Sequence, residues 1–212
     1  EPLPVAALCE RLGVTHLDAG VLQVRALVRE EGDPLPERTD VYTSGARVAA
    51  SLRREFRARY GRPLYIHYGA SEFGRVTTTY PHGDADHDES VGRFEPAVAW
   101  QVVDDDGAPV RPGDIGTLKV RTAKMIAGYV DDPVATARHF REGWYFPGDL
   151  ARVDAEGRLH LVGSADEMIN LHGVKVSPAE IERVLEALPG VRAAAAFALP
   201  SKVHGQIPLA AV

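Results

Sequence analysis

In several stretches of the first sixty residues, hydrophobic side chains recur every three or four positions, the spacing of amphipathic helices. The clearest case is the stretch 47–60, where apolar side chains recur at every fourth position and arginines fall between them. Those apolar positions are Val48, Leu52, Phe56 and Tyr60. Residues 5–12 and 19–28 show similar spacing, so residues 1–40 are predicted to be mostly helical.

A short apolar strand is expected after the last of these helices. Gly61 stands where a left-handed C-cap belongs, and residues 64–68 form an apolar run beyond it. A helix that is followed by a short buried strand is typical of an α/β layer. We therefore predict an α/β layer over residues 1–90.

The pattern changes to that of β-structure after this layer. Residues 100–103 and 117–121 flank one turn signal, and residues 150–153 and 158–162 flank another. The two signals are Asp104-Asp105-Asp106-Gly107 and Ala155-Glu156-Gly157. Such paired runs predict hairpins. We interpret residues 91–163 as a strongly bent, barrel-like β subdomain.

Two further helices are indicated by their first residues. Asp132-Pro133 predicts a helix that runs to about residue 141, with proline at its first position. Ser177 and Glu180 have the spacing of a capping box, in which the serine hydroxyl accepts a helix N–H and the glutamate reaches back. The apolar stripe of this second helix is Ile181, Val184, Leu185 and Leu188. Gly190 is expected to end it.

Composition narrows the classes of protein that remain. The 212 residues carry 24 Lys and Arg against 30 Asp and Glu, a net charge of −6, which argues against a general nucleic-acid binder. Hydrophobic residues make up 45% of the sequence and charged residues 25%, as in ordinary globular proteins. With one cysteine, the chain can form neither an internal disulfide nor a cysteine-based zinc site.

The apolar runs and the first residues of the sequence bear on the cellular location of the protein. No apolar run approaches the roughly 20 residues that span a bilayer, so no membrane span is expected. The sequence begins Glu-Pro-Leu-Pro, without an initiator methionine and without the basic region and apolar core of a signal peptide. We expect a cytoplasmic chain that is a fragment of something longer.

Four motifs follow one another along the chain. They are Tyr68-Gly69-Ala70-Ser71-Glu72; Gly116-Thr117-Leu118 with Gly128-Tyr129, Pro133 and Thr136; Gly143-Trp144-Tyr145-Phe146-Pro147-Gly148-Asp149-Leu150; and the stretch from Gly163 to Glu182. In this order they resemble the motifs of the adenylate-forming superfamily, which comprises acyl-CoA synthetases, adenylation enzymes and luciferases. The resemblance covers nearly the whole chain.

This resemblance implies an ATP-dependent reaction in two steps. A carboxylic acid attacks the α-phosphorus of ATP to give an acyl-adenylate, and a thiol of coenzyme A or of an acyl carrier protein's phosphopantetheine then takes the acyl group. Residues 1–163 would be the C-terminal part of the large domain, and residues 164–212 the start of a small α+β domain. The family's phosphate loop and catalytic lysine would lie outside the chain, so the isolated chain is expected to be inactive.

The first motif, by this resemblance, would bind the phosphates and the adenine. Glu72 would be the Mg²⁺ ligand and would act with Ser71 as a catalytic residue at the phosphates. Tyr68 would flank the adenine, and Gly69 would let the backbone approach the nucleotide closely. The alternative is that these residues are simply a strand end and a turn.

Two other elements would complete the nucleotide site. Asp149 would hold the ribose, because one carboxylate can accept both hydroxyl hydrogens. The alternative is a turn aspartate after Gly148. Ser44, Gly45 and Ala46 resemble the family's element beside the adenine. The alternative is that Ser44 is a helix N-cap, which needs no ligand, and the two roles are compatible.

The small domain carries two matching positions and, near it, two departures. Asp166 aligns with the family's hinge residue, and Gly173 with the loop that lines the thiol tunnel; a plain turn glycine is the alternative at 173. Ser164 stands where the family usually has arginine, and Pro147 where it has threonine or serine. These departures motivate an alternative function, a degenerate, non-catalytic homologue that binds an acyl-adenylate or a carrier protein.

Three other features are interpreted without a ligand or left open. Lys175, between two valines, is interpreted as an outward strand residue. His67 either touches the acyl pocket or is a buried, hydrogen-bonded histidine. A polar loop that lacks metal-ligand spacing is interpreted as solvated; its candidate ligands are His82, Asp84, Asp86, His87 and Asp88.

Overall fold

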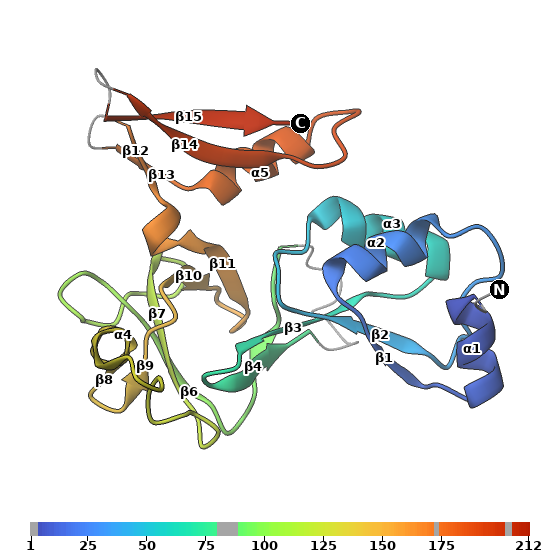
Figure 1. Cartoon of the computed structure of the whole chain (residues 1–212), viewed down its shortest axis with the longest axis horizontal. Helices are drawn as coiled ribbons and strands as arrows, with labels where there is room; N and C mark the ends of the chain where they lie inside the picture. The colour runs from blue at the N-terminus through green and yellow to red at the C-terminus, as the bar shows by residue number, and fades with distance from the viewer. Residues whose placement is uncertain (1–3, 80–88, 172–173, 202–204) are drawn as a thin grey trace. The chain divides into compact units, whose positions relative to one another are not determined.

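The computed structural model describes residues 4–79, 89–171, 174–201 and 205–212 (Figure 1). The chain divides into two compact units, one of Glu1–Ala70 with Arg75–Glu95 and one of Ser71–Gly74 with Pro96–Val212. Each unit contains both helices and strands and has buried hydrophobic residues of its own. The fold is therefore mixed α/β. The domain boundary expected between residues 163 and 164 stays a prediction.

The first unit is built on a five-stranded sheet. Its strands, in spatial order, are β1 (His16–Asp18), β2 (Asp40–Thr43), β3 (Tyr65–Ala70), β4 (Gly74–Thr78) and β5 (Arg93–Phe94). β1, β2 and β3 run parallel, whereas β4 and β5 are antiparallel. Three helices accompany them, namely α1 (Val5–Leu12), α2 (Val21–Arg29) and α3 (Ala50–Tyr60). Because α2 and α3 connect the parallel strands, this unit has an α/β arrangement, whereas the predicted bounds of the layer, residues 1–90, stay a prediction.

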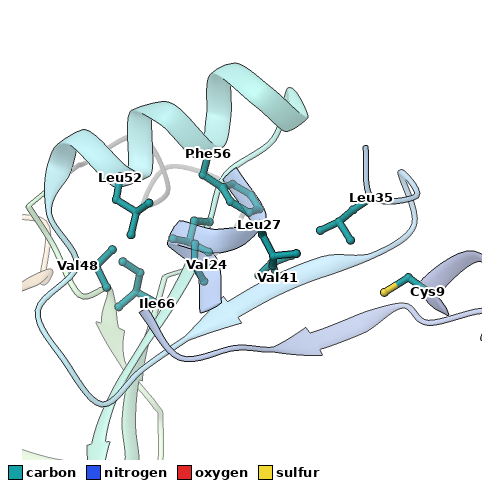
Figure 2. Packing of buried hydrophobic residues seen from close by; sticks show 10 residues of the cluster. Cys9, Val24, Leu27, Leu35, Val41, Val48, Leu52, Phe56 and Ile66 are labelled. Carbon is teal, nitrogen blue, oxygen red and sulfur yellow. The ribbon is translucent and has the colours of Figure 1, made fainter. Parts of the chain in front are cut away.

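Helices α2 and α3 bury their apolar stripes against these strands. Figure 2 shows Leu52 and Phe56 pointing from α3 toward the cluster that contains Val24 and Val41. Phe56, Val24 and Val41 are fully buried. The same cluster also holds Cys9, Leu27, Leu35, Val48, Leu64 and Ile66. Truncating a buried phenylalanine costs about 3–5 kcal/mol, so this cluster is a main source of stability for the layer.

The helical spacing does not reveal two of the parallel strands or the start of α3. β1 and β2 have 3 and 4 residues, which is too short for a periodic signal within a region predicted to be mostly helical. Helix α3 begins at Ala50 and its N-cap is Ala49, so the alternative role of Ser44 as N-cap is wrong. At the other end, Gly61 has φ 66°, the left-handed C-cap that the sequence predicts.

The second unit contains a six-stranded antiparallel sheet. The spatial order is β11 (Leu159–Ser164), β10 (Asp149–Val153), β7 (Gly116–Arg121), β9 (Trp144–Tyr145) and β8 (Phe140–Arg141), and β6 (Ala99–Val103) also pairs with β7. Among the described strands, these pairings close no ring. The predicted hairpin strands are present, but the barrel-like shape is not confirmed.

Both predicted turn signals are built on an aspartate that caps its own turn. Asp104 Oδ1 accepts hydrogen bonds from the amides of residues 106 and 108, at 3.0 and 2.9 Å. Asp154 Oδ1 does the same for residues 156 and 158, at 3.1 and 2.8 Å. Each turn then needs a residue with positive φ, which Gly107 and Gly157 supply at 82° and 80°.

A four-stranded sheet with one helix follows β11. Its strands, in spatial order, are β13 (Val174–Val176), β12 (Ile169–Leu171), β15 (Gly205–Ala211) and β14 (Ala195–Ser201). The short 3-10 helix η1 (Ala165–Glu167) leads into it, and α5 (Pro178–Glu186) lies between β13 and β14 in sequence. Figure 1 shows α5 beside these strands. This part of the second unit therefore combines one helix with an antiparallel sheet, and a separate small domain over residues 164–212 stays a prediction.

The predicted capping box at the start of α5 is wrong. Ser177 is the N-cap residue, but its hydroxyl caps no helix amide and instead donates to the Val162 carbonyl at 2.7 Å. Ser177 is buried, so this bond fastens the start of α5 to strand β11. Tertiary contact has therefore replaced the local cap. The helix also ends at Glu186, four residues before the left-handed Gly190.

Candidate functional site

Glu72 lies in the turn that joins β3 to β4, and the backbone of this turn is fastened to a segment distant in sequence. The Ile126 amide donates to the Glu72 carbonyl at 2.9 Å. The Thr122 hydroxyl donates to the Phe73 carbonyl, also at 2.9 Å. Phe73 is buried, and its ring centroid lies 5.1 Å from that of Tyr145. These contacts fix where the Glu72 side chain begins.

The Glu72 carboxylate is half-buried beside two tyrosine hydroxyls. The Tyr129 hydroxyl donates to Glu72 Oε1 at 2.9 Å and lies 3.0 Å from the Tyr145 hydroxyl. Burial, the hydrogen bond with Tyr129 and the charge of Glu72 all raise the pKa of Tyr145. Burial and the hydrogen bond to Glu72 likewise raise the pKa of Tyr129. Both phenols therefore stay protonated at neutral pH.

A metal ion at Glu72 would need most of its ligands from a substrate or from water. Within the residues that the structure describes, no group of three or more His, Cys, Asp or Glu side chains could hold a metal ion. Mg²⁺ is often bound through one or two carboxylates together with phosphate oxygens and waters. A carboxylate has about four acceptor positions, and two hydroxyl donors occupy at most two of them. Glu72 fits a single-carboxylate site, with the exposed Ser71 beside it.

The proposed adenine residues lie at one edge of the parallel sheet. Ser44, Gly45 and Ala46 form an exposed stretch directly after β2, while the half-buried Tyr68 and Gly69 lie near the end of β3. Because β2 and β3 are parallel neighbours, their carboxyl ends share an edge. Ligands of open α/β sheets bind at such an edge. The placement agrees with a nucleotide role, which stays a prediction.

His67 is held by a stacked ring and a hydroxyl. Its ring stacks on Tyr42 at 4.9 Å, and its Nδ1 lies 3.0 Å from the Thr78 hydroxyl, which in turn donates to Glu95. Burial, followed by the charge of Arg75, lowers the pKa of His67. A neutral, hydrogen-bonded imidazole is therefore present, as one of the two interpretations expects.

Asp149 and Ser164 are direct neighbours in the β10–β11 ladder. Asp149 is the first residue of β10 and pairs with Ser164 at the end of β11. The Ala165 amide also donates to the Gly148 carbonyl at 2.7 Å, which continues the contact past the ladder. The residue expected to bind ribose thus lies opposite the position where the superfamily usually has arginine. Pro147 precedes them and is half-buried.

Asp166, the expected hinge residue, is exposed in η1 and forms an ion pair with a side chain of helix α4 (Pro133–His139). Arg138 Nη2 lies 2.5 Å from Asp166 Oδ2, and the two side chains are 61% and 67% exposed. Exposed pairs of this kind contribute about 0–1 kcal/mol. The contact therefore restrains Asp166 only weakly.

Several sequence predictions lie outside the described residues. Gly173, assigned to the thiol tunnel, is one of them, and so is the polar loop with its five candidate ligands, His82, Asp84, Asp86, His87 and Asp88. Lys175 lies in strand β13 opposite Asn170, as a strand residue should. Its outward orientation stays a prediction.

Comparison with known proteins decides the family. The model of the AMP-binding enzyme family matches residues 2–130, which include the first motif and Glu72, as well as Gly128 and Tyr129. The chain belongs to the AMP-binding enzyme family. This agrees with the resemblance to adenylate-forming enzymes that the four motifs carry.

Relatives and solved structures of the AMP-binding family extend this match. A long-chain-fatty-acid–CoA ligase of Escherichia coli O157:H7 is 36% identical over 69% of this chain and 26% of its own length. The amide bond synthetase McbA of Marinactinospora thermotolerans superposes with a TM-score of 0.88 at 29% identity, over 97% of this chain and 43% of that one. The o-succinylbenzoate CoA synthetase MenE of Bacillus subtilis, in complex with its acyl-adenylate, gives 0.85 at 26% identity, over 97% and 42%.

The match covers only part of each relative. The chain spans between about a quarter and just over a third of the length of the curated AMP-binding relatives it matches. Its described helices include none that is both long and apolar enough to cross a membrane.

The second family motif, which the sequence leaves without a role, contacts Glu72 in the structure. The Tyr129 hydroxyl donates to Glu72 Oε1, and the Tyr129 amide donates to Thr136 Oγ1, each at 2.9 Å. Tyr145, from the third motif, lies in the same group. The only signal for these residues is the motif itself, because residues 72, 129 and 145 are too far apart for any local pattern to connect them.

Proposed function

We propose that this chain is part of an ATP-dependent acid–thiol ligase. Such an enzyme activates a carboxylic acid as an acyl-adenylate and passes the acyl group to coenzyme A or to a carrier protein's phosphopantetheine. The observation that carries the proposal is the Glu72 carboxylate, which Tyr129 fixes on a tethered turn in a member of the AMP-binding family. The names of the relatives, a CoA ligase and an enzyme crystallised with its acyl-adenylate, support this reaction class.

The phosphate residues would act through charge and position. When bound, Mg²⁺ would neutralise phosphate charge as the carboxylate attacks, and Glu72 would hold it. The hydroxyl of Ser71 would donate to a phosphate oxygen. Holding acid and phosphate in line converts a bimolecular reaction into one within a complex, which lowers the barrier.

The remaining residues would bind the nucleoside and move the small domain. Asp149 would accept both ribose hydroxyls. Tyr68 and Gly69 would lie against the adenine, together with Ser44, Gly45 and Ala46. Asp166 would be the hinge, and Gly173 would line the thiol tunnel, within a domain organisation that divides at residues 163 and 164. The phosphate loop and the catalytic lysine would come from sequence outside residues 1–212.

The test is pyrophosphate exchange by the full-length protein that contains this chain. Incubation with ATP, Mg²⁺ and a broad panel of carboxylic acids should give exchange with at least one acid. Glu72→Gln and Asp149→Asn should each reduce the exchange about 100-fold or more, because each removes a charged partner of the nucleotide or metal. Glu37→Gln, an exposed carboxylate outside the proposed site, is the matched control. No exchange with any acid would refute the proposal.

A second candidate function rests on Ser164. A serine supplies neither the charge nor the fork of donors that an arginine gives opposite Asp149. The chain would then come from a non-catalytic homologue that binds an acyl-adenylate or a carrier protein. Calorimetry with a non-hydrolysable acyl-adenylate mimic separates the two: binding without exchange favours the non-catalytic homologue, and binding with exchange favours the ligase.

A further inference from the structure

We propose that Tyr129 is a positioning residue that orients the Glu72 carboxylate for a divalent metal ion. The inference rests on the proposed function, because it takes Glu72 as the metal ligand. It adds a named residue and a mechanical role for the segment 128–136, which the sequence shows only as a motif.

The contact itself is direct. The Tyr129 hydroxyl donates to Glu72 Oε1 at 2.9 Å, and the Tyr145 hydroxyl, 3.0 Å away, can donate to Tyr129 in turn. A bond to one carboxylate oxygen fixes the rotation of the group about its last torsion. It leaves the carboxylate with further acceptor positions for a metal ion.

The backbone of Tyr129 is braced by helix α4. The Tyr129 amide donates to Thr136 Oγ1 at 2.9 Å, and that hydroxyl donates to the Asp132 carbonyl at 2.8 Å. Asp132 caps the helix by accepting from the Ala135 amide at 2.8 Å. A Cβ at Gly128 would lie 2.6 Å from Thr136 Cγ2, so only glycine allows this close approach. The motif residues Gly128, Tyr129 and Thr136 thus form one brace.

Aromatic packing holds the Tyr129 ring from the sides. Its ring meets Phe140 edge-on at 5.6 Å between centroids, and Phe140 meets Tyr145 at 4.8 Å. Tyr145 in turn packs against the buried Phe73, next to Glu72 in sequence. The hydroxyl of Tyr129 therefore has little freedom to leave the carboxylate.

This arrangement gives Tyr129 the function of an outer partner of a metal ligand. Removing such a partner typically lowers metal affinity or activity 10–100-fold while the ligand itself remains. The effect should be on the metal rather than on folding, because the brace and the ring packing do not use the hydroxyl.

The test is Tyr129→Phe in the full-length protein, with Mn²⁺ as the probe. Mn²⁺ binding in the presence of α,β-methylene-ATP is followed by electron paramagnetic resonance, and thermal unfolding is followed in parallel. We expect Mn²⁺ affinity to fall about 10-fold with little change in the unfolding temperature. The Mg²⁺ concentration for half-maximal exchange should rise by a similar factor. The matched control is Tyr60→Phe, which removes another phenolic hydrogen bond, of 2.8 Å to the Leu27 carbonyl, and should leave Mn²⁺ affinity unchanged.

Glu72→Gln separates the failure of this inference from that of the proposed function. If Glu72→Gln weakens Mn²⁺ binding and Tyr129→Phe does not, the positioning role is refuted and the metal assignment stands. If neither variant changes binding, both are refuted. Should Tyr129→Phe fail to fold, Thr136→Val removes the hydroxyl that braces the Tyr129 amide, and unchanged Mn²⁺ affinity in that variant overturns the proposal.

Discussion

Two pairs of polar residues face each other across the hairpin of strands β10 and β11, although neither pair is adjacent in the sequence. Asp149 and Ser164 are paired across β10 and β11, so side chains at these positions are within reach of the same ligand. Asp154 and His160 meet across the same hairpin, with Nε2 and Oδ2 2.9 Å apart. Both pairs lead to predictions about charge.

Ser164→Arg should strengthen nucleotide binding by the full-length protein. An arginine opposite Asp149 supplies a fork of charged donors, and one charge-assisted hydrogen bond to a phosphate contributes about 1.5–3 kcal/mol. ATP affinity measured by calorimetry should therefore rise roughly 10-fold or more. Ser164→Gln, which is long but neutral, should give a smaller gain. An unchanged affinity in the arginine variant would contradict the expectation that position 164 lies beside the bound nucleotide.

Asp154→Asn should destabilise the protein in a pH-dependent way. Burial opposes ionisation of Asp154, but hydrogen bonds from His160 and from the Arg158 amide, together with the Arg158 charge, outweigh it and lower the pKa from 3.8 to about 2. The depressed pKa contributes about 2 kcal/mol above about pH 4, and this is lost as the pH falls toward 2.

Urea unfolding of Asp154→Asn at several pH values measures this contribution. The difference from the unmodified protein should be largest at neutral pH and should shrink below pH 4. Asp104→Asn is the control, because the described hydrogen bonds to the Asp104 carboxylate come from two backbone amides rather than from an Arg or His side chain. A pH-independent loss in Asp154→Asn would show that the carboxylate charge is not the cause.

Secondary-structure elements show how far sequence patterns lead. Helix α1 has the predicted bounds, and α3 follows its predicted stripe, because each is long enough to show a 3.6-residue period. The turns at Asp104 and Asp154 are predictable because their chemistry is local. The short strand β1 and the hydrogen bond of the Ser177 hydroxyl to Val162 are not predictable from the sequence, because each depends on a partner distant in sequence.

Gly116→Ala should destabilise the β6–β7 pair. A Cβ at Gly116 would lie 2.4 Å from the Val103 carbonyl oxygen, a backbone atom that cannot move without breaking the ladder. Overpacking of this kind costs about 1–3 kcal/mol, and we expect the upper part of that range in thermal or urea unfolding. Gly107→Asn is the control, since open space surrounds that position and asparagine tolerates positive φ. Equal stability of both variants would disagree with the close approach at Gly116.

At the scale of the whole molecule, a destabilising substitution in the core of one unit should leave the stability of the other unit largely unchanged. The cluster around Phe56 contains only residues of the first unit. Phe56→Ala should cost about 3–5 kcal/mol and speed amide hydrogen exchange in α2, α3 and β1–β3. Exchange in β10 and β11 should change much less. Uniformly faster exchange across both units would show that they unfold together.

The family of this chain can be recognised from the order of four sequence motifs, without knowledge of their structure. Glu72 and Asp149 are recognisable because each lies in a motif whose residue types suit a nucleotide; the family match covers Glu72 and ends at residue 130. The Glu72–Tyr129 contact spans 57 positions, so only the folded chain reveals it. The residue roles in the proposed site are predictions that the exchange experiment tests.

The buried thiol of Cys9 makes this molecule convenient for labelling. Cys9 is the only cysteine in the sequence and lies within the hydrophobic cluster around Phe56 (Figure 2). Because burial raises the pKa of its thiol, it should react slowly with maleimides. Cysteines introduced at the exposed Leu22 and Val134, which are 81% and 79% exposed, would then take up fluorophores selectively. Energy transfer between the two dyes would report whether the two units unfold together or one after the other as urea is added.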